Sequence, residues 1–213
     1  MDTSWLGDQR DVVMVDGPDA ATYLHSQASQ DLRGMSEGES RWTFLLQPTG
    51  RVDVLARVTM VGEETFRLDT DRGCGPILEA RLNRFKIRVK ATVAAVDDEG
   101  GSITGSEDDR IAAGWPKMGA EIVPGETIPA ETGLADVAVS YTKGCYPGQE
   151  LVERMDSRGS AAPHHLAVLP RRPDDAPGVA VLRDGVEIGR ITSVGTAQVL
   201  AYIKRGIDGP ERD

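Results

Sequence analysis

The fold is decided by residues 41–61, which read RWTFLLQ-PTG-RVDVLARVTMV. Residues 41–47 and 51–61 flank Pro48-Thr49-Gly50, and apolar runs on both sides of such a turn predict a β-hairpin with a short loop. Alternate positions of the second run are apolar and share one face of a strand: Val52, Val54, Ala56, Val58 and Met60. The stretch therefore predicts an antiparallel pair of strands with one buried face.

The residues before this hairpin predict a strand and a helix. Residues 11–16 form a short apolar run typical of a buried strand, and Pro18 is well placed to open a helix. Apolar residues then recur every four positions, which predicts a helix of about four turns that Gly34 ends. They are Ala20, Leu24, Ala28 and Leu32.

The residues after the hairpin extend the pattern. A third strand is expected after Gly62, and residues 76–86 have the apolar spacing of a helix. Alternation of Ile87, Val89, Ala91 and Val93 then predicts another strand. The order β-α-β-β-β-α-β is close to the split ferredoxin-like pattern with one added strand. We therefore predict an α+β sandwich with helices on one face of a mixed sheet.

The second half of the chain differs from the first in composition and in the length of its apolar runs. Residues 97–109 are acidic and rich in Gly and Ser, which predicts an exposed loop, and residues 110–142 are interpreted as a wrapping segment. Four short apolar runs follow, at 166–169, 179–182, 186–194 and 197–203, with Asp184-Gly185 as a hairpin turn. They predict a small C-terminal β-barrel. The expected domains are 1–163, 164–205 for the barrel, and a frayed tail at 206–213.

Composition limits the functional classes. The chain has 213 residues, 39% hydrophobic, which suffices for one sizeable core or a core with a small satellite. No apolar run is long enough for a membrane span, and the N-terminus lacks a secretory signal, so we expect a cytoplasmic protein. The net charge of −10 argues against nucleic acid as a partner. The densest positive stretch, residues 81–90, is interpreted as a solvated surface, with attraction of a polyanionic small molecule as the alternative.

Cysteine and histidine usage excludes a structural metal site. Cys74 and Cys145 are the only cysteines, too few for a disulfide framework or a structural zinc site. Adjacent residues of a strand point to opposite faces, so His164 and His165 are unsuited to sharing a metal. We predict no metal site.

One segment has the composition of a reactive loop. Residues 143–150 read KGCYPGQE, so Cys145 lies between Gly144, which frees the backbone for an unusual turn, and a second turn at Pro147-Gly148. The ammonium of Lys143 would favour the thiolate. A helix at 149–155 would lower the thiol pKa further if its N-terminus faced the sulfur. A lone cysteine is more often buried filler, an interpretation we apply to Cys74. For Cys145 the residues alone leave both roles equally open.

Residues 143–150 resemble the K-G-C-[YF]-x-G-Q-E signature of the YgfZ family, which is related to the glycine-cleavage T-protein. Further segments resemble that family in the same order: Val15–Ala20, Gln47–Arg51, Arg84–Ala91, Arg110–Pro116, Ile128–Glu131 and Glu187–Ser193. The resemblance thus spans nearly the whole chain and implies the fold of the T-protein.

The resemblance also implies a function. It implies tetrahydrofolate binding in a central cavity and support of iron–sulfur cluster assembly or repair, with client or assembly proteins as partners. Cys145 would be the key residue, Lys143 and Glu150 its electrostatic partners, and Arg154 a neighbour. Gly144, Tyr146, Gly148 and Gln149 complete the motif. Glu131 would accept hydrogen bonds from the pterin amino group. Tyr146, Trp42 and Phe44 are candidate apolar walls, although core packing is the preferred role for Trp42 and Phe44.

Two alternatives stay open. The first is a folate-dependent aminomethyltransferase of the glycine-cleavage type. Against it, Asp53 is a lone acid, and Leu55 stands where the resemblance would place the folate-positioning aspartate. The second is a non-catalytic scaffold with the same fold. Under any of them, two thiols are too few to hold a four-ligand cluster, so only a shared or transient cluster is expected.

Overall fold

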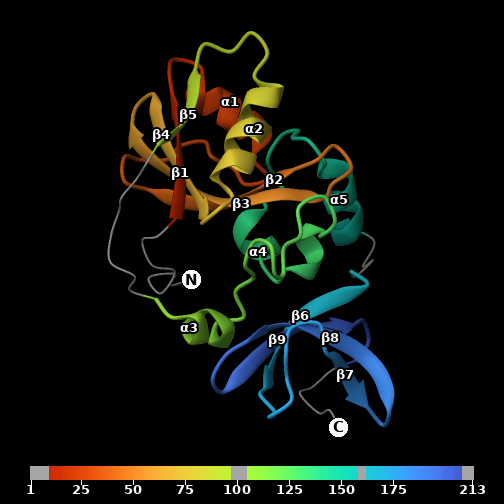
Figure 1. The fold of residues 1–213 in the computed structure, drawn as a ribbon. Helices are drawn as coiled ribbons and strands as arrows, with labels where there is room; N and C mark the ends of the chain where they lie inside the picture. The colour runs from red at the N-terminus through yellow and green to blue at the C-terminus, as the bar shows by residue number, and fades with distance from the viewer. Residues whose placement is uncertain (1–9, 97–104, 158–161, 208–213) are drawn as a thin grey trace.

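The computed structural model describes residues 10–96, 105–157 and 162–207. Two β-sheets lie at opposite ends of the molecule, and the segment from α3 (Glu107–Ala112) to α4 (Ala135–Ala138) lies between them (Figure 1). None of the described helices combines the length and the hydropathy that are required to cross a membrane.

The first sheet has five strands in the order β2-β3-β4-β1-β5. Its strands are β1 (Arg10–Asp16), β2 (Ser40–Leu46), β3 (Val52–Gly62), β4 (Thr65–Asp71) and β5 (Thr92–Val96). All neighbouring pairs are antiparallel, so the expectation of a mixed sheet was wrong. The split β-α-β unit is present: β4 and β5 run in the same direction, and β1 is inserted between them.

The predicted hairpin at residues 41–61 is confirmed. β2 pairs with β3 from Ser40↔Thr59 to Leu46↔Val52, with an irregularity at Leu45/Leu46. Gly50 closes the turn through its N–H, which donates to the carbonyl of Gln47 at 2.8 Å.

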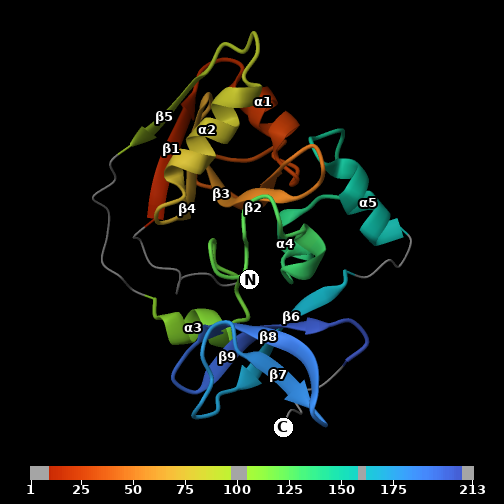
Figure 2. The ribbon, with the colours of Figure 1, turned by 45° about the vertical axis from the view of Figure 1, so that its right-hand side comes forward.

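Two helices cover one face of this sheet, as predicted (Figure 2). They are α1 (Ala20–Gln27) and α2 (Gly75–Phe85). Leu24 of α1 and Leu82 of α2 pack in one buried cluster with Val54, Ala56 and Val58 of β3. The alternation that predicted the strand therefore also selected the face that the helices cover from Val54 onward. For Val52 the prediction was wrong, because it packs in the cluster on the other face, next to the irregularity at Leu45/Leu46.

Helix α1 is shorter than the predicted four turns. It ends at Gln27, and Ala28 takes an extended conformation and forms an isolated bridge with Leu45. The N–H of Ser29 donates to the carbonyl of Phe44 at 3.1 Å. Leu32 is buried without being helical, because pairing with β2 replaces the last helical turns.

The predicted strand at 87–93 was also wrong in its position. The strand β5 begins only at Thr92. Arg88 has a positive φ of 57°, which is incompatible with a strand, and the Ile87 residue is 75% exposed. Val89, Ala91 and Val93 still pack against the first buried cluster, so the alternation marks an inward-facing side although only its last residues belong to a strand, and Ile87 is the exception.

The middle segment packs on the other face of the sheet. It contains α3 (Glu107–Ala112), the short 3₁₀ helix η2 (Pro129–Glu131) and α4 (Ala135–Ala138), and α5 (Gln149–Ser157) follows. This segment and the sheet share a second buried cluster, formed by Trp42, Phe44, Leu46, Val52, Leu55, Trp115, Met118, Ile122, Leu134, Ala138, Val139, Tyr146 and Val152. The wrapping segment predicted at 110–142 is confirmed. Of the loop predicted at 97–109, residues 97–104 lie outside the described residues. The prediction was wrong for residues 107–109, which form the first turn of α3, because Ser106 caps that helix.

The C-terminal strands form an open sheet rather than the predicted barrel. The strands are β6 (His164–Pro170), β7 (Ala180–Arg183), β8 (Val186–Val194) and β9 (Gln198–Lys204), in the order β6-β9-β8-β7. Among the described residues, β6 and β7 do not pair with each other, so the sheet does not close. Asp184 and Gly185 both have positive φ, 52° and 72°, as a two-residue type I′ hairpin requires. Of the predicted tail, residues 208–213 lie outside the described residues.

A buried ion pair connects the middle segment to this sheet. Arg110 of α3 donates to Glu121 at 3.0 Å and to the hydroxyl of Ser193 on β8 at 2.7 Å. The hydroxyl of Ser193 donates to Glu121 at 2.6 Å, so the three side chains form a closed triangle. Removing one partner would leave a buried charge uncompensated, so this contact fixes how the second sheet docks.

Candidate functional site

The motif loop (residues 143–148) is seated on the hairpin turn between β2 and β3. Gly148 has a φ of +82°, and a Cβ at this position would lie 2.4 Å from the carbonyl oxygen of Gln47. In return, a Cβ on Gly50 would lie 2.4 Å from the Cβ of Leu151. Two glycines thus let two distant turns of the chain touch backbone to backbone.

Gly144 does not have the role that was predicted for it. Its φ is outside the left-handed region, and a Cβ there would meet nothing within 4 Å. The predicted turn at Pro147-Gly148 is present. The need for glycine in the motif loop therefore lies at Gly148.

Lys143 is buried beneath the motif loop. Its ammonium donates to the carbonyls of His25 and Ala28, and to that of Gln30 at 3.3 Å. These carbonyls lie in and just after the last turn of α1, where helix carbonyls lack partners and a cation is favoured. Burial lowers the pKa of Lys143 to about 8, despite the opposing effect of Asp31. Lys143 therefore caps α1, and its effect on the thiol of Cys145 stays a prediction.

Cys145 is exposed, whereas Lys143 and Tyr146 of the same loop are buried. Tyr146 is buried, and its ring lies 5.0 Å from the ammonium of Lys143. Burial is the main cause that raises the pKa of the Tyr146 hydroxyl. The loop thus displays the sulfur and anchors its neighbours.

Cys74 has the opposite environment. It is partly buried against the second core cluster. Burial raises the pKa of its thiol, and the nearby carboxylates Asp71 and Asp11 raise it further. A thiol in these surroundings is mostly protonated, which agrees with its interpretation as a packing residue.

Helix α5 begins at Gln149, directly after the motif loop, so the predicted short helix is present. Its polar side chains pair along its own surface. Glu150, whose side chain is 89% exposed, accepts a hydrogen bond from Arg154 at 2.9 Å, and Gln149 donates to Glu153. The roles predicted for Gln149, Glu150 and Arg154 at the thiol stay predictions.

Asp53 is held by structural partners. It accepts a hydrogen bond from Gln47 at 2.8 Å, and its Oδ2 lies 3.2 Å from Nε of Arg81. Arg81 is buried and also donates to Gln27 and to the carbonyl of Leu46, so its assignment to a solvated surface was wrong. Leu55 is buried, and its N–H faces the sulfur of Met118 at 3.5 Å.

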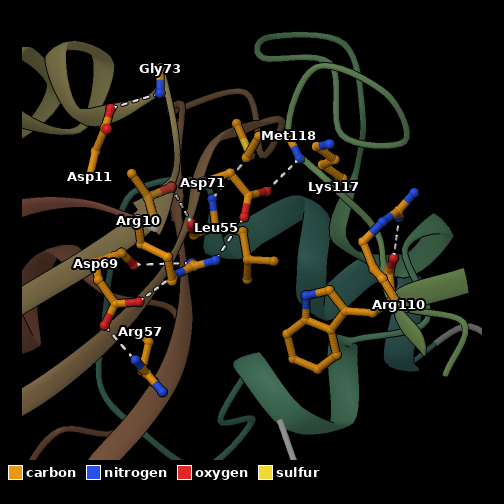
Figure 3. A network of polar contacts seen from close by, with 12 residues as sticks. Arg10, Asp11, Leu55, Arg57, Asp69, Asp71, Gly73, Arg110, Lys117 and Met118 are labelled. Carbon is orange, nitrogen blue, oxygen red and sulfur yellow. Dashed lines mark hydrogen bonds and ion pairs between the residues drawn. The ribbon is translucent and has the colours of Figure 1, made fainter. Parts of the chain in front are cut away.

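Sequence reasoning missed a polar network at the centre of the molecule (Figure 3). The side chain of Asp69 is fully buried and contacts Arg10, Arg57 at 2.9 Å and Arg67 at 3.1 Å. Arg10 also pairs with Asp71 at 2.8 Å, and Asp71 accepts from the N–H of Met118 at 2.8 Å.

The signal for this network was in the strand pattern. Arg57 and Asp69 are register partners on β3 and β4 and have opposite charges. The guanidinium groups of Arg10 and Arg57 lie 5.2 Å and 5.8 Å from the ring of Trp42. Trp42 in turn packs edge-on against Trp115, with ring centroids 4.8 Å apart. Trp42 is therefore a core residue, the role preferred for it.

A pocket of about 350 Å³ lies between the middle segment and the C-terminal sheet. Glu131, of η2, lines it, and its Oε1 lies 3.2 Å from Nδ1 of His164. The lining is Ala120, Glu121, Val123, Glu126, Thr127, Glu131, His164, Glu187, Gly189, Arg190, Tyr202 and Lys204. Neither Cys145 nor Tyr146 is part of this lining. The predicted site residues therefore divide between an exposed thiol loop and a separate pocket.

Comparison with known proteins gives relatives of low identity. No family model matches the chain. The iron-sulfur cluster assembly factor IBA57 homolog of Neurospora crassa mitochondria is 22% identical over 79% of this chain and 55% of its own length. The human mitochondrial assembly factor IBA57 is 39% identical, over 30% of this chain and 16% of its own length. The chain thus spans about half or less of the length of these two relatives.

Among solved structures, the glycine cleavage system aminomethyltransferase T of Bartonella henselae is similar. The TM-score is 0.79 at 16% identity, and the match covers 95% of this chain and 79% of that one. The chain therefore has the T-protein fold that the resemblance implied. Membership of the YgfZ family in particular stays a prediction.

Proposed function

We propose that this chain, with its T-protein fold, supports iron–sulfur cluster assembly or repair through the thiol of Cys145. The observation that carries this proposal is the exposure of Cys145 on a loop fixed by Lys143, Tyr146 and Gly148. The similarity to two iron-sulfur cluster assembly factors supports it. The thiolate of an accessible cysteine on a loop that is held in place is a suitable ligand for iron.

The thiol would act together with a partner protein. A four-ligand cluster needs several thiolates, and the other cysteine, Cys74, is partly buried in a core cluster. In the proposal, Cys145 therefore contributes at most one ligand to a cluster that is cargo, and a client or assembly protein contributes the others.

Complementation tests the thiol. In a strain that lacks this protein, Cys145→Ser should fail to restore the activity of iron–sulfur enzymes, whereas Cys74→Ser should restore it if the variant folds. Protein levels measured by immunoblotting separate loss of activity from loss of folding. Full restoration by Cys145→Ser would overturn the proposal.

We further propose that the pocket at Glu131 binds the pterin ring of tetrahydrofolate. Glu131 has a mostly covered side chain whose only described partner is His164, so it can accept hydrogen bonds from an amino group. The volume suits a single ring system rather than a whole folate with its tail.

A calorimetric titration with tetrahydrofolate tests this second proposal. Glu131→Gln should weaken binding by about tenfold or more, because it replaces a charged acceptor in a largely covered position. Glu126→Gln is the matched control on the exposed rim of the same pocket. Absence of binding to the wild type would reject the folate proposal, favour a scaffold role and leave the thiol proposal standing.

An aminomethyltransferase activity is not proposed. Similarity to the aminomethyltransferase at 16% identity concerns the fold. Asp53, the acid of the hairpin, is engaged by Arg81 and Gln47, and Leu55 is buried. Formation of methylene-tetrahydrofolate from an aminomethyl-lipoyl donor would reverse this conclusion. The cytoplasm also stays a prediction, since both named relatives are mitochondrial proteins.

A further inference from the structure

The loop that joins α2 to β5 carries unpaired positive charge. The basic loop is defined as residues 84–90, which includes the last two residues of α2, and Arg84, Arg88 and Lys90 are exposed in it. Within residues 10–96, 105–157 and 162–207, none of the three forms an ion pair with a carboxylate. The chain as a whole has a net charge of −10, so a patch of uncompensated cations is a local exception.

An apolar side chain stands in the middle of these cations. Ile87 is 75% exposed, more than any other large hydrophobic residue among the exposed ones that the structure describes. Its neighbours in sequence are Lys86 and Arg88. An isoleucine with cations on both sides matches the composition of interface centres, where apolar residues and arginine are combined.

The basic loop is held in a defined shape. Two hydrogen bonds to Asp19 hold the backbone of Lys90. The N–H of Lys90 donates to the carboxylate of Asp19 at 2.7 Å, and the carbonyl of Lys90 accepts from the N–H of Asp19 at 3.3 Å. Gly17 packs against the backbone of Lys90, because a Cβ on Gly17 would lie 2.5 Å from the carbonyl oxygen of Lys90. The ammonium of Lys86 donates to the carbonyl of Ala91 at 2.9 Å.

The turn itself is strained. Arg88 has a φ of 57°, a conformation that disfavours residues with a side chain by about 1–2 kcal/mol. The same turn exposes Ile87. Backbone strain of this kind is concentrated at ligand clamps and other functional positions of proteins.

We propose that the basic loop docks an acidic segment of a partner protein that also carries an apolar residue. Carboxylates of that segment would pair with Arg84, Arg88 and Lys90, and its apolar side chain would cover Ile87. The footprint is small, and a long polyanion such as nucleic acid or an anionic membrane would be repelled by the rest of this acidic chain. A short acidic segment avoids that repulsion.

The location keeps this surface separate from the other sites. The basic loop lies at the end of the molecule opposite the C-terminal sheet, whereas Glu131 lines a pocket against that sheet (Figures 1 and 2). The inference therefore depends neither on the thiol of Cys145 nor on folate binding.

Fluorescence anisotropy with a labelled peptide tests the inference. The probe Glu-Glu-Leu-Glu-Glu-Leu-Glu-Glu is compared with a peptide in which both leucines are serine. The full chain should bind the leucine peptide more tightly, by about threefold or more, because Ile87 then gains an apolar contact. Arg84→Glu/Arg88→Glu should weaken binding of the leucine peptide by about tenfold or more.

Two further variants sharpen the result. Arg33→Glu/Lys117→Glu changes the net charge equally at exposed positions elsewhere and should leave binding within about twofold of wild type. Arg88→Gly relieves the backbone strain and should weaken binding without lowering the melting temperature. Ile87→Ser should make the two peptides equivalent.

Several outcomes would overturn the inference. Absence of peptide binding would do so, as would equal weakening by the two charge-reversed variants, or equal affinity of the wild type for both peptides. Binding of duplex DNA or of phosphatidylserine vesicles through the basic loop, without peptide binding, would reject an acidic protein segment in favour of another polyanion.

Discussion

The two sides of the motif loop have opposite environments although they lie within six residues of each other. On the inner side, Lys143 donates to carbonyls at the end of α1, Tyr146 packs in the core, and Gly148 touches the hairpin turn. On the outer side, Cys145 is exposed, and Glu150 at the start of α5 faces solvent.

This difference separates residues that shape the loop from the residue that can react. A sequence motif alone gives its members equal weight. The structure assigns the inner residues to stability, so their replacement should lower the free energy of unfolding, whereas replacement of Cys145 should leave it nearly unchanged.

Gly148→Ala should have the largest effect. A Cβ at Gly148 meets backbone 2.4 Å away and imposes a positive φ on alanine, so we expect a loss of about 3 kcal/mol or more in the free energy of unfolding. Gly119→Ala has the same positive φ but open space and should lose only about 1–2 kcal/mol. Gly144→Ala has neither problem and should stay within about 0.5 kcal/mol. Chemical denaturation measures all three, and equal losses would contradict the division.

Lys143→Met should follow in magnitude. It leaves three carbonyls at the end of α1 without their donor, which should lower the free energy of unfolding by about 2–3 kcal/mol. Lys86→Met is the control, because Lys86 donates to a single carbonyl in a half-buried position and should lose about 1 kcal/mol. If both variants lost the same amount, Lys143 would not be the cap of α1.

The same lysine predicts a smaller, pH-dependent effect. The pKa of Lys143 is about 8 in the fold, below its ordinary value of 10.5, so the unfolded chain binds more protons between these two values. The contribution of Lys143 to the free energy of unfolding should therefore rise with pH from about 8 to 10.5 and be constant below that window. Denaturation of wild type and Lys143→Met across this range measures it, and a difference that is independent of pH would refute it.

Cys145→Ser should have the smallest effect on stability, within about 0.5 kcal/mol, because its side chain is exposed. Cys74→Ser places a hydroxyl against the second core cluster and should lose about 1 kcal/mol. Alkylation of the native protein should show the reverse order, with Cys145 modified rapidly and Cys74 slowly. Slow alkylation of Cys145 would mean that the outer side of the loop is not accessible.

Local patterns were sufficient for many elements of the fold. The hairpin at residues 41–61, helix α2, helix α5 and the turn at Asp184-Gly185 were all predicted, because each depends on spacing or turn chemistry within a few residues. The local pattern placed Cys145 on a loop between turns but left its exposure open, and it did not predict the burial of Lys143 and Tyr146. Arg81 and Ile87 were predicted incorrectly, since burial of a cation or exposure of an apolar residue depends on what lies opposite.

By itself, the sequence determined the periodicities and turns of this chain, and through them the order of the strands and helices up to β5 and of the C-terminal strands, but not the short helices α3, η2 and α4. Only the tertiary structure decided where α1 ends, because Lys143 lies more than a hundred residues away from the carbonyls it caps. It also decided which cations are buried and that Glu131 faces a pocket apart from Cys145. The physical reason is that the energy of a charge or a polar group depends on its partners in space, and these partners come from distant parts of the chain.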